Sequence, residues 1–250
     1  MLTGMTTETG MRKLHASYMP VSMTGEALRE ELFSLFARYY ADVDYRRFRH
    51  DLMEKDGLIL LSGEDGAPRG FSTIGVSRHT IGGEVIRALF SGDTIIDHRY
   101  WGEHAFAIAW LRRAGEIWRQ APDAPLYWFL VVKGYRTYRY LPVFAKEYYP
   151  SFRNAMPERI RNIRDHLATE RFGGSYDPQS GIVHFPEPRG RLRRRWLEPP
   201  ENQRDRPEAR FFRQMNPHHA RGDELVCLAE LSPANMPPFA ARIFEPKSER

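Results

Sequence analysis

The segment from Phe90 to Ala105 contains the residue pattern with the clearest chemical meaning in this chain. A run of β-forming residues ends near Ile96, a turn follows, and helical spacing begins directly after Gly102. The first turn of a helix offers unpaired backbone N–H groups and the positive end of the helix dipole. Such a junction can bind a pyrophosphate, because Gly102 allows close backbone approach and Arg99 adds a charged contact. The alternative is that both residues only build a tight turn.

Titratable side chains lie on both sides of this turn. Asp93 interrupts an otherwise apolar strand, where an unpaired carboxylate is costly, so we expect it to have a partner. One such partner is an arginine, with which it would form a structural ion pair. Asp97 ends the strand, and His98 and His104 can titrate near neutral pH, although they can equally be structural.

Hydrophobic periodicity predicts the elements that position these residues. Helical spacing predicts helices over residues 24–39, 44–52, 102–118 and 134–140, and apolar runs predict strands over 57–62, 70–77, 85–96 and 126–132. Thr24 and Asp44 are the expected N-caps, and Pro142 is expected to end the fourth helix. This order predicts an α/β (α+β) fold with a mixed, mostly antiparallel sheet flanked by helices.

The second half of the chain is rich in arginine and poorer in apolar residues. Helices are predicted over residues 157–172, 208–215 and 233–244, and strands over 182–185 and 225–231. We expect residues 151–250 to form an extension packed on residues 24–150, and residues 1–23 to form a flexible N-terminal segment. The run from Arg189 to Arg195 suits contact with phosphates, or it is a solvated loop.

Bulk composition excludes several classes of protein. Hydrophobic residues make up 42% of the 250 residues, which argues against disorder over most of the chain. A single cysteine, Cys227, excludes an internal disulfide and a cysteine-rich zinc site, and the histidines lack tight metal-binding spacing, so no metal site is expected. Without a signal peptide or membrane span, we expect a soluble cytoplasmic protein. The net charge of +5 has two explanations, a compositional bias toward arginine or the binding of an anionic partner. Nucleic acid is not the partner we expect.

Arg99 and Gly102 also match the first two fixed positions of a family motif. The segment from Thr24 to Pro150 resembles the GCN5-related N-acyltransferases (GNATs), which hold the pyrophosphate of coenzyme A (CoA) in an Arg/Gln-x-x-Gly-x-Gly/Ala turn at this junction. His104 departs from the motif, because glycine or alanine is usual there and Ala105 comes one residue late. The segments 133–142, 210–217 and 222–227 resemble bacterial GNAT-like proteins of unassigned activity. The residues that the resemblance places around CoA are Arg99, Trp101, Gly102, Glu103, His104 and Ala105.

The same resemblance implies a reaction. It implies transfer of an acyl group to the amine of a small molecule or peptide, with acyl-CoA or an acyl carrier protein as co-substrate and no tightly bound cofactor. Asp93 would be the base and Tyr138 the acid, the latter preferred over Tyr135 and Tyr140 because it sits one turn into its helix. Each tyrosine can instead be a core residue. The strand that ends near Ile96 and the strand 126–132 should be neighbours that diverge at their carboxyl ends.

A second hypothesis belongs to another class of protein. The chain can be a GNAT-shaped binding protein without catalysis that engages an anionic partner through its arginine-rich second half. His104 favours this alternative, whereas Asp93 together with Tyr138 favours the enzyme.

Overall fold

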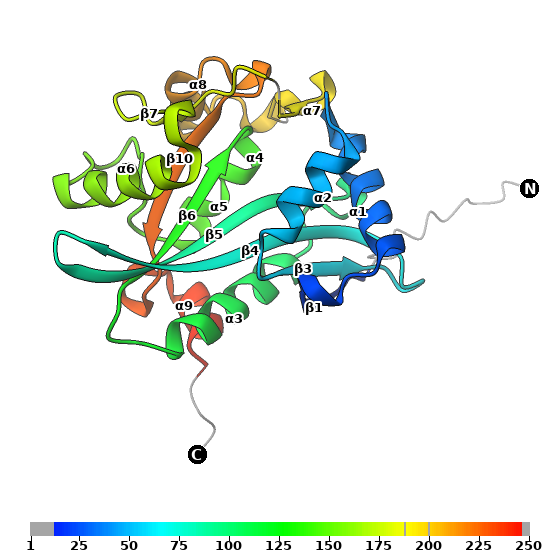
Figure 1. Ribbon diagram of the computed structural model, residues 1–250, viewed down its shortest axis with the longest axis horizontal. Coiled ribbons are helices and arrows are strands. Elements are labelled where there is room, and N and C mark those ends of the chain that lie inside the picture. Colours follow the sequence, from blue (N-terminus) through cyan, green and yellow to red (C-terminus); the bar gives the residue numbers. More distant parts are fainter. Residues whose placement is uncertain (1–12, 188, 200, 247–250) are drawn as a thin grey trace, which may run out of the picture.

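A mixed sheet runs through the computed structural model, which describes residues 13–187, 189–199 and 201–246 (Figure 1). Its strand order is β1-β3-β4-β5-β6-β10-β8-β7. All neighbours are antiparallel except β5 and β6, which are parallel. The strands are β1 (His15–Pro20), β3 (Gly57–Ser62), β4 (Pro68–Ile81), β5 (Glu84–Ile96), β6 (Leu126–Val132), β7 (Tyr176–Asp177), β8 (Ile182–Val183) and β10 (Glu224–Glu230). The predicted mixed, mostly antiparallel sheet is therefore confirmed.

Helices cover both faces of this sheet because its central strands are apolar on both sides. Ile86, Ala88 and Phe90 of β5 belong to a core on one face, and Leu89 belongs to the core on the other. The Leu89 face packs against α3 (Ala105–Arg119), α4 (Tyr135–Tyr138), α5 (Tyr140–Phe144), α8 (Pro207–Met215) and α9 (Pro238–Phe244). The opposite face packs against α1 (Glu26–Tyr39), α2 (Tyr45–Met53) and α6 (Glu158–Phe172). No helix in the described part of the chain is long and apolar enough to cross a membrane.

Capping residues explain where two of these helices begin. Asp44 caps α2 as predicted, because its side chain accepts a hydrogen bond from the backbone N–H of Arg47 at 2.9 Å. The prediction for Thr24 is wrong: its hydroxyl donates to the carbonyl of Val21 at 2.6 Å, and Gly25 occupies the N-cap of α1. Pro142 lies inside α5 rather than ending a helix, since a proline is tolerated in the first helical turn.

Arg87 fixes the carboxyl end of α3 to strand β5. Its guanidinium donates hydrogen bonds to the carbonyls of Ile117, Trp118, Ala121 and Ala124 at distances of 2.6 to 3.2 Å. These carbonyls lie at and beyond the helix end, where backbone bonds to the third residue along replace the regular helical bonds and the helix dipole has its negative end. The contact orients α3 so that its amino end lies beside the carboxyl end of β5.

The first and last parts of the chain both contribute strands to the main sheet, and the first of them corrects an expectation from the sequence. Residues 15–20, expected to be part of a flexible segment, form β1 and pair with β3 from His15↔Ser62 to Pro20↔Gly57. Residues 151–250 contribute to the main sheet, because β10 is an inner strand between β6 and β8, and α9 packs on α3. Both parts of the chain thus share one sheet and one core. Residues 1–12 of the expected N-terminal segment lie outside the described residues.

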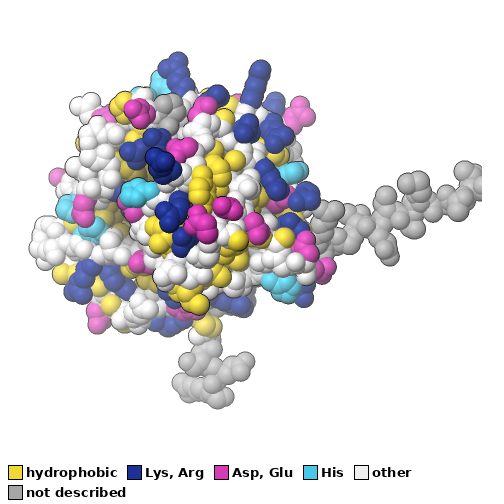
Figure 2. Space-filling model, turned by 45° about the vertical axis from the view of Figure 1, so that its right-hand side comes forward, with side chains coloured by type: hydrophobic (Ala, Val, Ile, Leu, Met, Phe, Trp, Pro, Cys, Tyr) yellow, Lys and Arg dark blue, Asp and Glu magenta, His cyan; other side chains and the backbone are white. Residues whose placement is uncertain are grey.

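The arginine run attaches the second half of the chain to α1. Arg191 pairs with Asp42 at 2.5 Å, and the side chains of Arg193 and Arg195 donate to the carbonyls of Ala37 and Arg38. These contacts hold β9 (Arg191–Leu192) against β2 (Tyr40–Ala41) and α7 (Arg194–Leu197) against the end of α1. Part of the basic charge of the arginine run is therefore used within the molecule. On the face drawn in Figure 2, basic and acidic side chains are interspersed around exposed hydrophobic atoms.

Gly115 lies where α3 approaches α9. A Cβ atom at this position would overlap the backbone carbonyl of Phe244, so the two helices can come this close only with glycine. We expect Gly115→Ala to lower the free energy of unfolding by about 1–3 kcal/mol, because α9 must move away. Urea denaturation measures this change. Gly75→Ala is the control, since its Cβ would meet only Lys55 Cδ at 3.8 Å, and equal losses in both variants would contradict the contact.

Candidate functional site

The parallel strands β5 and β6 separate at their carboxyl ends. They pair from Arg87↔Leu126 to Ser91↔Leu130, after which β5 continues along β4 as far as Ile96. Strand β6 instead continues along β10 to Val132. At the last paired position the hydroxyl of Ser91 accepts hydrogen bonds from two buried indoles, those of Trp110 and Trp128, at 3.1 and 3.0 Å. The predicted divergence of these neighbouring strands is confirmed.

A β-bulge in β5 coincides with this separation. The register against β4 changes between Ser72↔Thr94 and Ile74↔Ser91, so Gly92 and Asp93 together face Thr73. An extra residue of this kind bends the strand and re-aims a side chain. Glycine is required at position 92, because a Cβ atom there would collide with the Thr73 hydroxyl. The bulge places Asp93 in the wall of a cavity.

Two cavities meet at the opening between the strands. The first, the Asp93 cavity, has a volume of about 440 Å³ and lies among α1, α2, α6 and the carboxyl ends of β5 and β6. The second, the Gly102 cavity, has a volume of about 330 Å³ and lies at the amino end of α3 beside α4. Tyr40, Thr94 and Thr137 line both cavities. The two cavities are therefore adjacent.

The carboxyl group of Asp93 titrates near neutral pH. Burial raises its pKa to about 7, and the neighbouring carboxylate of Asp51 acts in the same direction. Lys133 and Lys55 oppose this shift, but they are paired: Lys133 with Glu224 at 3.1 Å, and Lys55 with Asp51 at 2.9 Å. Among the described residues Asp93 has no hydrogen-bond partner, so the expected structural partner is absent there. A carboxyl group with this pKa is suited to general base catalysis near pH 7.

The Gly102 turn lies against a cavity at the amino end of α3. Gly102 has a φ of +106°, a conformation that favours glycine, and space is open where its Cβ would lie. His104 is the N-cap residue of α3 and makes no side-chain capping hydrogen bond, so the first N–H groups of the helix are not capped by it. Trp101, Gly102, Glu103 and His104 line the Gly102 cavity. Four of the six residues expected around CoA are thus brought to one cavity.

Arg99 and Ala105, the other two residues, do not line this cavity. The guanidinium of Arg99 is held by Asp97, with Nε donating at 3.0 Å and a terminal nitrogen at 2.6 Å. This pairing corrects the expected role of Arg99 as the charged contact, because its charge is already neutralised by a neighbouring carboxylate. Arg136 and Arg139 line the cavity instead, and the guanidinium of Arg136 lies 3.9 Å from the ring centre of Trp101.

Tyr138 lies in the core and away from both cavities. Its side chain is fully buried (0% exposed), its hydroxyl donates to the carbonyl of Pro150 at 2.8 Å, and its ring contacts those of Tyr148 and Phe212. Burial raises the pKa of Tyr138 far above its usual range. This placement contradicts the assignment of Tyr138 as the acid. One residue corresponds to about 100° of helical rotation, so the preceding Thr137 faces the opening while Tyr138 faces inward.

Tyr40 is a tyrosine at the opening that the sequence analysis missed. It follows α1, its ring stacks on Phe36 with centroids 4.6 Å apart, and it lines both cavities. Burial raises the pKa of its hydroxyl, and the nearby carboxyl of Asp93 contributes to the same shift. The hydroxyl has no hydrogen-bond partner among the residues that the structure describes. No local motif marks Tyr40, since only the tertiary structure brings it to Asp93.

Comparisons with known proteins found similarity only among solved structures. No family model matches the chain, and no curated protein matches it. Among solved structures, it is similar to a probable N-acyltransferase of unknown function from Enterococcus faecalis, with 13% identity and a TM-score of 0.41, over 54% of this chain and 33% of that one. It is also similar to Escherichia coli ElaA, with 16% identity and a TM-score of 0.37, over 56% and 93% of the two chains.

A third similar structure is a GNAT-family N-acetyltransferase from Escherichia coli in complex with CoA, with 14% identity and a TM-score of 0.35, over 48% of this chain and 64% of that one. The chain spans about a third of the length of the Enterococcus protein. Each of these similarities covers about half of this chain. In this chain the parallel strands β5 and β6 separate beside the amino end of α3.

Proposed function

We propose that this protein is an acyltransferase that moves an acyl group from acyl-CoA to an amine. The observation that carries the proposal is the opening between β5 and β6, which joins a cavity at the amino end of a helix to a cavity containing Asp93. The first cavity suits a pyrophosphate, and the second contains a carboxyl group with a pKa of about 7. The same proposal includes acyl carrier protein as an alternative acyl donor, a small-molecule or peptide amine as the acceptor, and a cytoplasmic location.

In the proposed reaction acyl-CoA binds in the Gly102 cavity and the amine binds in the Asp93 cavity. The pyrophosphate of CoA lies against the backbone of residues 101–104, near Arg136 and Arg139, and its thioester reaches the opening near Thr94 and Tyr40. The amine enters through the Asp93 cavity. Asp93 accepts a proton from the ammonium form, and the neutral amine attacks the thioester carbonyl. The C–S bond then breaks as the amide forms, and the leaving thiolate takes a proton from the hydroxyl of Tyr40. The attacking nitrogen loses its second proton to the Tyr40 phenolate, and Asp93 releases its proton to solvent, so both side chains return to their starting states.

Binding of CoA is the first test of this proposal. A ligand that binds only the native state raises the melting temperature, and the stabilisation grows with the logarithm of its concentration relative to the dissociation constant. We expect free CoA, acetyl-CoA and a long-chain acyl-CoA to raise it, whereas adenosine, which lacks the phosphates, should have a much smaller effect. No change with any of the three thioester or thiol ligands at millimolar concentration would contradict the proposal.

Gly102 allows a sharper test of where CoA binds. We expect Gly102→Asp to weaken CoA binding by more than about tenfold, or about 1.4 kcal/mol, because a carboxylate would repel the pyrophosphate. Gly102→Ala is the matched control, since it introduces the same backbone strain at a φ of +106° without a charge. Isothermal titration calorimetry measures both affinities. Equal affinities of the two variants would show that the phosphates bind elsewhere.

A further inference from the structure

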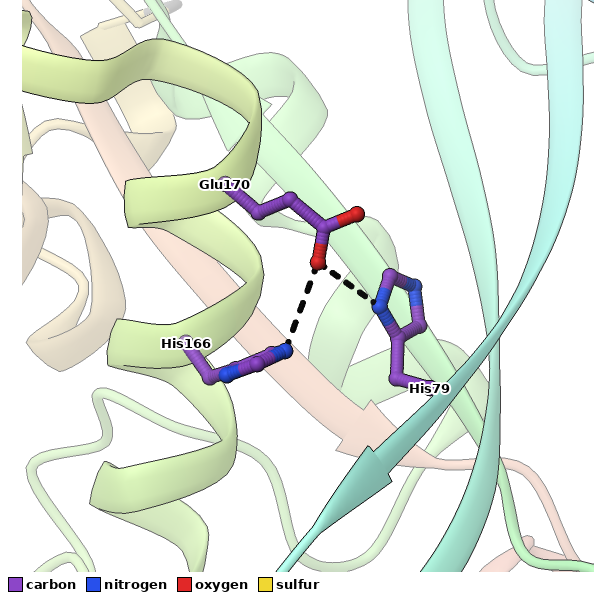
Figure 3. A group of neighbouring side chains, drawn as sticks. All are labelled: His79, His166 and Glu170. Carbon is purple, nitrogen blue, oxygen red and sulfur yellow. Dashed lines mark hydrogen bonds and ion pairs between the residues drawn. The ribbon is translucent and has the colours of Figure 1, made fainter.

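Two histidines and a glutamate meet outside both cavities. His79 lies on β4, and His166 and Glu170 lie on α6 (Figure 3). One carboxylate oxygen of Glu170 is 3.0 Å from Nδ1 of His79 and 3.3 Å from Nε2 of His166. All three candidate ligand atoms lie within 4.8 Å of one another. None of these residues lines the Asp93 or Gly102 cavity.

The fold fixes this arrangement from two directions. Residues 166 and 170 are four apart in α6, so their side chains lie on the same face of the helix. The β4–β5 hairpin continues its pairing out to Ile81↔Glu84, and His79 pairs with Ile86 within it. Ile86 and Ile163 of α6 belong to the same core, so the hairpin and the helix are packed together just beside the three polar side chains.

The two distances from Glu170 to the histidines suit a tetrahedral metal ion. Zinc binds imidazole nitrogen and carboxylate oxygen at about 2.0–2.2 Å, which places neighbouring ligand atoms about 3.3–3.5 Å apart in a tetrahedron. The distances of 3.0 and 3.3 Å from Glu170 to the two histidines are close to this edge length. Two imidazoles and one carboxylate are also a donor set that suits zinc.

His79 has a contact at its second ring nitrogen that helps to orient the ring. Its second ring nitrogen, Nε2, lies 2.7 Å from the hydroxyl of Ser77. A hydrogen bond at this nitrogen fixes the ring orientation and leaves Nδ1 free to bind a metal ion. The side chain of His79 is 9% exposed, whereas those of His166 and Glu170 are 41% and 59% exposed, so an ion can enter from the solvent side.

We propose that His79, His166 and Glu170 form a binding site for Zn²⁺, with water completing the tetrahedron. The ion links the β4–β5 hairpin to the last turns of α6. Arg171 and Phe172, which directly follow Glu170, line the Asp93 cavity. Metal binding would thus fix the helix end that forms one wall of that cavity.

Zinc titration of the metal-free protein tests this site. Isothermal titration calorimetry with ZnCl₂ should show one saturable site, and Co²⁺ should give the visible absorption of a tetrahedral complex. His79→Ala and Glu170→Gln should each weaken Zn²⁺ binding by more than about tenfold, since even the loss of a supporting residue typically costs 10–100-fold. Zn²⁺ should also raise the melting temperature of the unmodified protein but not that of His79→Ala.

His50→Ala provides the matched control. His50 and Glu54 are likewise four residues apart on a helix, with Nε2 and the carboxylate 3.3 Å apart, but they lack a third ligand in the described structure. This variant should keep the Zn²⁺ affinity of the unmodified protein. The proposal is overturned if no saturable binding occurs, because the three residues then form only a hydrogen-bonded network. It is also overturned if His79→Ala and Glu170→Gln bind Zn²⁺ as tightly as the His50→Ala control.

Discussion

Replacing Asp93 by asparagine is expected to lower kcat by about 10²–10⁴-fold, because the variant cannot accept a proton from the ammonium substrate. The side chains have nearly the same shape, so acyl-CoA affinity should be preserved. In the unmodified protein the rate should rise with pH around 7, where Asp93 loses its proton. In the variant this limb of the pH–rate profile should disappear. Release of CoA from acetyl-CoA in the presence of a panel of primary amines measures both effects.

The same substitution has a predictable effect on stability. Folding raises the pKa of Asp93 from its ordinary value of 3.8 to about 7, so between these two values the folded protein binds more protons than the unfolded chain. The contribution of Asp93 to stability therefore falls as the pH rises through this window. Asp93→Asn removes this pH-dependent loss of stability. At pH 8 the variant should therefore unfold at a higher urea concentration than the unmodified protein, and at pH 4 the difference between the two should be smaller. A variant that is less stable at pH 8 and retains its pH–rate profile would show that Asp93 is a structural residue.

Tyr40→Phe is expected to lower kcat by about 10²–10⁴-fold while leaving acyl-CoA binding almost intact. The hydroxyl is needed only when the thiolate leaves, so its loss affects the transition state and not the bound substrate. Phenylalanine keeps the stacking on Phe36, which protects the packing of the site. Steady-state kinetics and calorimetric titration with CoA separate the two quantities.

Tyr138→Phe is the control for this prediction. Its hydroxyl donates to the carbonyl of Pro150 in the core, and losing that partner should cost about 1–3 kcal/mol of unfolding free energy. Its kcat should change little at a temperature where the variant is folded. If Tyr138→Phe abolishes turnover while Tyr40→Phe leaves it unchanged, the proton donor has been assigned to the wrong tyrosine.

The sequence by itself determined the local elements and one part of the site. The strand 126–132 was predicted with its observed bounds, and the helix from residue 157 to 172 differs from α6 by one residue. Glycine at position 102 marked the turn before α3, where the backbone adopts positive φ. These features depend on neighbours in the chain, because apolar periodicity and glycine conformation are local properties.

Only the tertiary structure decided which side chains meet. The charged groups around Asp93 are Asp51, Lys133 and Glu224, which come from three separate segments of the chain. The direction of its side chain is set by a bulge that depends on pairing with β4. Periodicity shows that a face of α4 is buried but does not distinguish the opening from the core, which is why Tyr138 was misassigned. The inner position of β10 in the sheet and the proximity of His79 to His166 were likewise decided by the tertiary structure. Both depend on contacts between residues far apart in the chain, and these form only when the whole sheet is assembled around its shared core.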